Sequence, residues 1–232
     1  MGSSPVAKNT HARHNRRGGR DMRSTRKIIG ALLVCTGLWS TQVAAAPECV
    51  WPDDKTLEAI LPVATDHGSH ASGVVFAQNR VLTAAHAIDG AGNYFVKVND
   101  GFRPATLVLI DRQNDLAVLS VDTQAIEPVA LSLGTPSQSQ AVWAVGFPKA
   151  QGKTTSIGVF QRNRAGALHT SAPIDSGQSG GGLLTCNEGS YQLLGMLRGY
   201  GAYLSGDRYV KLQNHSVSVA AATIQRFIGS YQ

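Results

Sequence analysis

Between residues 73 and 121 the chain alternates short apolar segments with polar residues and turn formers. Each segment is bounded by Gly, Asn or Asp, and the segments span 73–76, 80–84, 94–98, 105–110 and 116–121. Short apolar runs between turn residues are typical of β-strands. This part of the chain is therefore expected to form one β unit.

A second β unit is expected after a stretch at 128–140 that is rich in Pro, Gly and polar residues. Its predicted strands span 141–147, 154–161, 182–185, 192–197 and 208–212. Apolar residues at 217, 220, 221, 224, 227 and 228 then follow a helical spacing, which predicts a C-terminal helix over 217–229. Another short helix is expected at 53–61.

The composition agrees with a folded, all-β protein. Hydrophobic residues make up 43% of the 232 residues and charged residues 16%, which excludes a mainly disordered chain. The 25 glycines and an aromatic content of only 6% suit many strands and tight turns better than a helical bundle.

The formal charge of +6 belongs to the N-terminal part of the chain. Residues 1–45 hold eight of the 21 Lys and Arg and one of the 15 acidic residues, so 46–232 carry 13 basic and 14 acidic residues, a net charge of −1. Nucleic acid is therefore not an expected partner.

Residues 1–45 are predicted to be a leader with a signal peptide, and Met22 is its expected start. Arg23, Arg26 and Lys27 precede an apolar run at 28–38, and the small residues 43–45 resemble a cleavage site. The run is too short to span a membrane, so no stable membrane anchor is expected after cleavage near Ala45. The mature chain, 46–232, is expected to be secreted or periplasmic.

The mature chain keeps two cysteines, Cys49 and Cys186. An even number in an exported protein favours a disulfide, and the alternative is two buried thiols. His67 and His70 have the spacing of metal ligands, but no third ligand is nearby, so we expect a polar loop. No metal and no cofactor are predicted.

Three segments carry candidate chemistry: VLTAAH at 81–86, NDLAVL at 114–119 and GQSGG at 177–181. Alone, His86 could be a structural residue and Asp115 a turn residue. Together with Ser179 they supply a nucleophile, a base and an acid that orients the base, and Asp111 is the alternative acid. The main-chain N–H groups of Gly177 and Ser179 are the candidate donors of an oxyanion hole.

The segments TAAH, DRQNDLAVL and APIDSGQSGG, in this order, resemble the motifs of trypsin-like serine proteases, closest to the HtrA/Deg type. The resemblance implies an all-β, chymotrypsin-like fold of two six-stranded antiparallel β-barrels with a C-terminal α-helix. The first barrel is expected at about 57–126 and the second at about 137–215. The triad would lie between the barrels, and Arg198 to Tyr200, through Gly199, would pair with the substrate backbone.

The chain departs from the family pattern at several positions. Pro173, followed by Ile174, stands where trypsin-type enzymes that select Lys or Arg carry an aspartate, so cleavage after a small or medium aliphatic residue is expected, unless Arg198 attracts an acidic side chain. Gln178 stands where zymogens carry an aspartate, which predicts an oxyanion hole formed by local main-chain hydrogen bonds. We also expect no PDZ domain.

The function predicted from the sequence is therefore a secreted or periplasmic serine endopeptidase that acts on polypeptide substrates through an acyl-enzyme. The alternative is a catalytically silent module with the protease fold that binds peptides or a partner. No sequence feature indicates the oligomeric state.

Overall fold

The computed structural model describes residues 49–90 and 92–230. The predicted signal peptide and its cleavage site lie outside these residues. No helix in the described part of the chain is long and apolar enough to cross a membrane.

The first barrel contains six antiparallel strands: β1 (Ile60–Thr65), β2 (His70–Ala77), β3 (Arg80–Thr83), β4 (Tyr94–Val98), β5 (Gly101–Asp111) and β6 (Leu116–Ser120). Their order is β1-β2-β3-β6-β5-β4, and β1 pairs with β4 to close the barrel. The short helix α1 (Asp54–Glu58) precedes β1 and is capped at its N-terminus by Asp53, whose carboxylate accepts a hydrogen bond from the N–H of Thr56 at 2.7 Å.

The second barrel contains β7 (Ala141–Gly146), β8 (Thr154–Arg164), β9 (Ala167–Thr170), β10 (Gly182–Asn187), β11 (Ser190–Ser205) and β12 (Arg208–Ala220). A 3₁₀ turn, η1 (Pro148–Ala150), follows β7. The order β10-β11-β12-β9-β8-β7 repeats the order of the first barrel, six strands later in the chain. The expectation of two six-stranded antiparallel barrels with a C-terminal helix is confirmed.

The predicted boundaries need two corrections. The C-terminal helix α3 spans Ala221–Gly229 and does not begin at 217, because Val217 and Val219 pair with β9 as part of β12, so the second barrel extends to Ala220. The helix expected at 53–61 ends at Glu58, and the apolar residues after it begin β1. In both places buried β-branched or aliphatic residues complete a barrel ladder, and this tertiary pairing overrides the local helical spacing.

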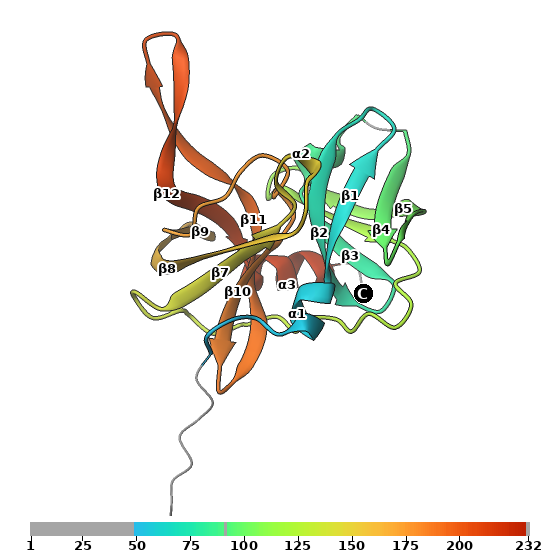
Figure 1. Ribbon diagram of the computed structural model, residues 1–232, viewed down its shortest axis with the longest axis horizontal. Coiled ribbons are helices and arrows are strands. Elements are labelled where there is room, and N and C mark those ends of the chain that lie inside the picture. The colour runs from blue at the N-terminus through green and yellow to red at the C-terminus, as the bar shows by residue number, and fades with distance from the viewer. Residues whose placement is uncertain (1–48, 91, 231–232) are drawn as a thin grey trace, which may run out of the picture. The chain divides into compact units, whose positions relative to one another are not determined.

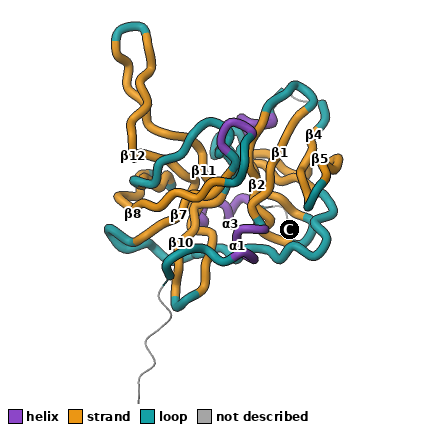
Figure 2. The backbone as a smooth tube through the Cα atoms, in the orientation of Figure 1, coloured by secondary structure: helices purple, strands orange, loops and turns teal. Residues whose placement is uncertain are grey.

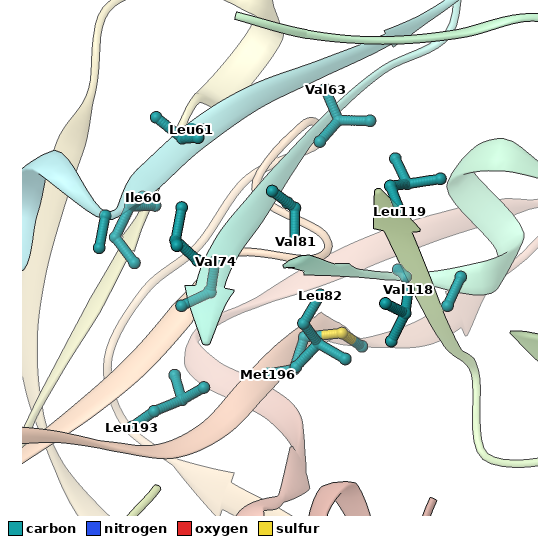
Figure 3. Packing of buried hydrophobic residues seen from close by; sticks show 14 of the residues in the cluster. Ile60, Leu61, Val63, Val74, Val81, Leu82, Val118, Leu119, Leu193 and Met196 are labelled. Carbon is teal, nitrogen blue, oxygen red and sulfur yellow. The ribbon is translucent and has the colours of Figure 1, made fainter. Parts of the chain in front are cut away.

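One hydrophobic cluster joins the two barrels. It includes Ile60, Val74 and Leu82 of the first barrel, and Leu193 and Met196 of β11, all with 0% exposure (Figure 3). Ile224 and Phe227 of α3 belong to the same cluster, so the helix packs against both β11 and first-barrel residues. Shared packing of this kind fixes the barrels relative to each other and hence the position of any site between them.

The β11–β12 hairpin continues beyond the second barrel as a two-stranded ribbon (Figures 1 and 2). The middle of β11 lies beside the GQSGG motif (177–181), because the carbonyl of Leu197 accepts a hydrogen bond from the N–H of Gly180 at 2.7 Å. Strand β11 therefore connects the candidate site to the ribbon.

Candidate active site

His86 and Asp115 are in hydrogen-bond contact at the edge of the first barrel. His86 lies on the one-turn helix α2 (Ala85–Ile88), just after β3, and Asp115 directly precedes β6. Nδ1 of His86 lies 2.8 Å from Oδ2 and 3.0 Å from Oδ1 of Asp115, and the main-chain N–H of His86 donates to Oδ1 at 2.9 Å. The carboxylate therefore orients both the ring and the backbone of His86.

The turn before β6 separates the roles of the two candidate acids. Oδ1 of Asp111 accepts hydrogen bonds from the N–H groups of Gln113 and Asn114 at 2.9 and 3.0 Å. The Asn114 side chain, together with these N–H groups, holds the pKa of Asp111 below its usual value. Asp111 thus stabilises the turn, and Asp115, which has a positive φ of 61°, is the acid that reaches His86.

Arg198 makes a second contact with the Asp115 carboxylate. Its Nε lies 3.3 Å from Oδ2, and the Asp115 side chain is 7% exposed. Burial raises the pKa of Asp115, but the hydrogen bonds from His86 and the charges of His86 and Arg198 outweigh burial, so the pKa lies below its usual value. Arg198 reaches Asp115 from a β-bulge, where the pairing of β11 with β12 shifts between Leu197 and Gly199.

Ser179 faces the same space as His86. Both line a hollow of about 360 Å³, together with Gly177, Gly199 and Tyr200 among other residues. The Ser179 hydroxyl donates to the carbonyl of Arg198 at 3.2 Å. The described residues offer it no other hydrogen bond, so Ser179 and His86 share the hollow without being bonded to each other.

The loop around Ser179 leaves two main-chain N–H groups unbonded. Within the described part of the chain, neither Gly177 nor Ser179 donates a main-chain hydrogen bond, whereas Gln178, Gly180 and Gly181 all do. Gly177 has a φ of +92°, and a Cβ there would lie 2.6 Å from the carbonyl oxygen of Phe147, so only glycine fits. The two free N–H groups belong to the residues predicted as oxyanion donors.

Gln178 is buried and holds the loop locally. Its Oε1 accepts a hydrogen bond from the N–H of Asp175 at 2.8 Å, and its own N–H donates to the carbonyl of Asp175 at 3.1 Å. The Gln178 carbonyl accepts from Gly181 at 2.9 Å. These bonds close the loop around Ser179 without a charged partner at Gln178.

The predicted substrate-binding residues fall into two groups. Arg198, Gly199 and Tyr200 line a second hollow of about 570 Å³ that also contains His86 and Asp115. Pro173 and Ile174 line neither hollow. Ile174 is only 3% exposed because it packs in the second-barrel core, and the exposed Pro173 uses its carbonyl to accept a hydrogen bond from Ser156.

Sequence reasoning did not find Lys149 and Ser72, which bind the nucleophile loop (175–181, around Ser179) from outside it. The N–H of Lys149 donates to the carbonyl of Ser176 at 2.7 Å, and the hydroxyl of Ser72 donates to the carbonyl of Gly177 at 2.9 Å. The sequence offers no signal for Ser72 beyond a polar residue directly before the apolar segment 73–76. Gly177, which accepts from its hydroxyl, lies 105 residues away in the sequence, so no local pattern could identify this contact.

The two cysteines and the candidate metal ligands complete the set of predicted residues. A disulfide joins Cys49 to Cys186 at the end of β10, with Cα atoms 6.2 Å apart. His67 lies 3.7 Å from the carboxylate of Asp66. Among the described residues no three His, Cys, Asp or Glu side chains gather as metal ligands.

Comparison with known proteins defines the class. The family described as the trypsin-like peptidase domain matches residues 71–196, which include His86, Asp115 and Ser179. The chain belongs to this family.

Its curated relatives include serine proteases of the HtrA/Deg type. The serine endoprotease DegS of Salmonella typhimurium is 32% identical over 126 residues, which cover 49% of this chain and 35% of DegS. The chloroplastic protease Do-like 5 of Arabidopsis thaliana is 32% identical over 111 residues, which cover 42% of this chain and 32% of the relative. The matches thus span about a third of each of these relatives.

Solved structures show the same fold. The serine endoprotease from Yersinia pestis has a TM-score of 0.65 at 24% identity, with 78% of this chain and 68% of the other covered. The HtrA-type protease AlgW, solved with a tripeptide, also has a TM-score of 0.65, at 23% identity, with 76% of this chain and 60% of the other covered. The arrangement of two barrels is therefore shared with HtrA-type proteases.

Proposed function

We propose that this protein is a secreted or periplasmic serine endopeptidase in which Ser179 is the nucleophile, His86 the general base and Asp115 the acid that orients the base. The observation that carries the proposal is the pair of contacts between His86 Nδ1 and the Asp115 carboxylate, made by a histidine that lines one hollow with Ser179. A carboxylate on Nδ1 fixes the tautomer whose other nitrogen, Nε2, can accept a proton.

The reaction follows from these positions. His86 Nε2 takes the hydroxyl proton of Ser179 as Oγ attacks the carbonyl carbon of the scissile peptide bond. The negative charge that develops on the carbonyl oxygen binds the free N–H groups of Gly177 and Ser179. The imidazolium then protonates the leaving amine, and water attacks the acyl-enzyme with His86 again acting as base.

Ser179 must change its hydrogen bond before it can react. Its hydroxyl donates to the carbonyl of Arg198, and rotation about the Cα–Cβ bond is the step that would turn it toward His86. Catalytic hydrogen bonds are often long or misaligned without substrate and form in the substrate complex. A peptide that pairs with the strand at Gly199 and Tyr200 would approach the Arg198 carbonyl and favour this rotation.

Export is part of the proposal and is supported by two features. The residues before Ala45 have the composition of a signal peptide, and Cys49 is bonded to Cys186. Disulfides persist in oxidising compartments, so the mature chain is suited to the periplasm or the exterior of the cell.

A fluorophosphonate probe tests the proposal, because it reacts only with an activated serine. Wild-type residues 46–232 should be labelled at Ser179, as located by peptide mass spectrometry, whereas Ser179→Ala and His86→Ala should not be labelled. Ser176→Ala is the matched control, because it removes another hydroxyl from the same loop and should retain labelling. Folded wild-type protein without labelling would favour the alternative, a catalytically silent module that binds peptides. The observation that supports this alternative is that the Ser179 hydroxyl bonds to the carbonyl of Arg198 and not to His86.

A further inference from the structure

The nucleophile loop is held by donors from outside it at two successive carbonyl groups. The carbonyl of Ser176 accepts from the N–H of Lys149 at 2.7 Å, and the carbonyl of Gly177 accepts from the hydroxyl of Ser72 at 2.9 Å. In a trans peptide the C=O and N–H groups point in opposite directions. The bond to Ser176 therefore turns the N–H of Gly177 away from Lys149. The bond to Gly177 fixes the next peptide plane, between Gly177 and Gln178, which joins the plane that carries the N–H of Gly177 to the plane that carries the N–H of Ser179.

Ser72 lies on β2 of the first barrel, has 0% exposure, and uses every hydrogen-bonding group it has. Its N–H donates to the carbonyl of Ser179 at 2.8 Å, and its carbonyl accepts from the Thr83 hydroxyl at 2.7 Å. Its Oγ accepts from the N–H of Phe147 at 2.9 Å. Because that N–H can only donate, the Ser72 hydroxyl proton is left for the carbonyl of Gly177.

The surroundings leave Ser72 Oγ little freedom to move. A Cβ on Gly146 would lie 2.9 Å from Ser72 Oγ, and a Cβ on Gly180 would lie 2.1 Å from the Ser72 carbonyl oxygen. The hydroxyl is therefore packed directly against the end of β7 and against the nucleophile loop. The Ser72 side chain of the first barrel thus restricts the conformation of the nucleophile loop in the second barrel.

We propose that Ser72 is a positioning residue whose hydroxyl, by holding the Gly177 carbonyl from the first barrel, aligns the N–H groups of Gly177 and Ser179 toward the oxyanion. This inference rests on the proposed function, because an oxyanion forms only if Ser179 attacks a carbonyl. Without the hydroxyl, the Gly177 carbonyl and the Phe147 N–H lose their shared hydrogen-bond partner. Rotation of the loop peptides that gives these groups new partners then becomes more favourable.

Ser72→Ala tests the proposal. We expect kcat to fall by about 10- to 100-fold, less than the full loss of an oxyanion donor, while KM changes by less than about threefold. A peptide aldehyde, whose adduct with Ser179 places an oxygen in the oxyanion hole, should bind more weakly by about the same factor as kcat falls. In a Ser179→Ala background, the affinity for the uncleaved peptide should not change on adding Ser72→Ala.

Two further variants keep the test decisive. Thr170→Val removes another buried hydroxyl, one that bonds to Ser216 within the second barrel, and it should lower stability without weakening aldehyde binding. Ser72→Gly removes the same hydroxyl and should show the same losses as Ser72→Ala, so misfolding of one variant does not decide the result.

The possible results distinguish a failure of the proposed role of Ser72 from a failure of the proposed function. Wild-type kcat and aldehyde affinity in both folded Ser72 variants would overturn the role of Ser72 while leaving the proposed function intact. Equal weakening of aldehyde and uncleaved peptide would also overturn it, because a general structural defect does not discriminate between them. If the wild-type protein is not labelled by the fluorophosphonate probe and does not cleave peptides, both the proposed function and the role of Ser72 are overturned.

Discussion

Arg198 and His86 share one carboxylate oxygen of Asp115: Arg198 Nε lies 3.3 Å from Oδ2 and His86 Nδ1 lies 2.8 Å from it. His86 also binds Oδ1 through its main-chain N–H, whereas Arg198 is half-exposed and makes one contact. The orientation of the His86 side chain therefore depends mainly on Asp115, and Arg198 adds a smaller contribution.

Substitutions at the two residues should differ greatly in effect. Asp115→Asn should lower kcat by about 10⁴, because an amide stabilises the wrong imidazole tautomer. Arg198→Met should lower kcat/KM by less than about tenfold, since His86 keeps its contacts with Asp115. Arg112→Met, which breaks an exposed pair with Asp89 in the same hollow, is the control. A loss of a hundredfold or more in Arg198→Met would make the guanidinium essential for orienting Asp115.

The lowered pKa of Asp115 gives an expected pH dependence of stability. The folded protein binds this proton less readily than the unfolded chain, so the stabilisation is present above the unfolded pKa of about 3.9 and is lost as the pH falls through the lower folded pKa. Urea unfolding between about pH 2.5 and pH 5 should show a steeper loss of stability for wild type than for Asp115→Asn. Asp207→Asn, in the exposed turn of the ribbon, should follow wild type; parallel curves for wild type and Asp115→Asn would contradict this account.

The features that could be predicted from the sequence are those set by residues close together along the chain. The strand pattern predicted two β units, and the three motifs predicted the family and, through it, the two barrels, because turn chemistry and motif spacing are local. The motifs also indicated His86 and Asp115, which are in contact, and Ser179, which lines one hollow with His86. The helical spacing at 217–220 was misleading, since pairing of Val217 and Val219 with β9 decides the structure there.

The remaining features depend on tertiary packing. Ser72 meets the nucleophile loop, and Arg198 meets Asp115, only when the two barrels pack together, so neither contact has a local signature. Ile174 was expected in the substrate pocket from its distance to Ser179 in the sequence. It packs inward because an apolar side chain is more stable in the second-barrel core.

The disulfide should contribute to the stability of the mature chain. Cys49 and Cys186 are 137 residues apart, so the bond constrains a long loop of the unfolded chain. Replacing both by serine should lower the free energy of unfolding by about 2–5 kcal/mol. A reductant should destabilise wild type to a similar extent and leave the double variant unchanged. A wild-type protein whose unfolding is insensitive to reductant would show that the bond does not stabilise the fold.

Cleavage should prefer small or medium aliphatic residues before the scissile bond. Pro173 offers no carboxylate to a substrate Lys or Arg side chain, and Asp175, which lines the hollow with Ser179, is already paired with Lys149 and Lys211. Arg198 is paired with Asp115. Profiling with a peptide library should give faster cleavage after Ala or Val than after Lys or Arg. Preferred cleavage after Lys would refute this expectation, and preferred cleavage after Glu would mean that Arg198 leaves Asp115 to bind the substrate.

During turnover, Ser179 is expected to carry the acyl group of the substrate. Intact-mass measurement on residues 46–232 mixed with an activated acyl ester should show a transient mass increase equal to one acyl group, located at Ser179 by peptide mapping. Ser179→Ala should show no adduct and a kcat about 10⁶ lower on a peptide substrate. Peptide hydrolysis by wild type without an adduct, or undiminished hydrolysis by Ser179→Ala, would contradict the account.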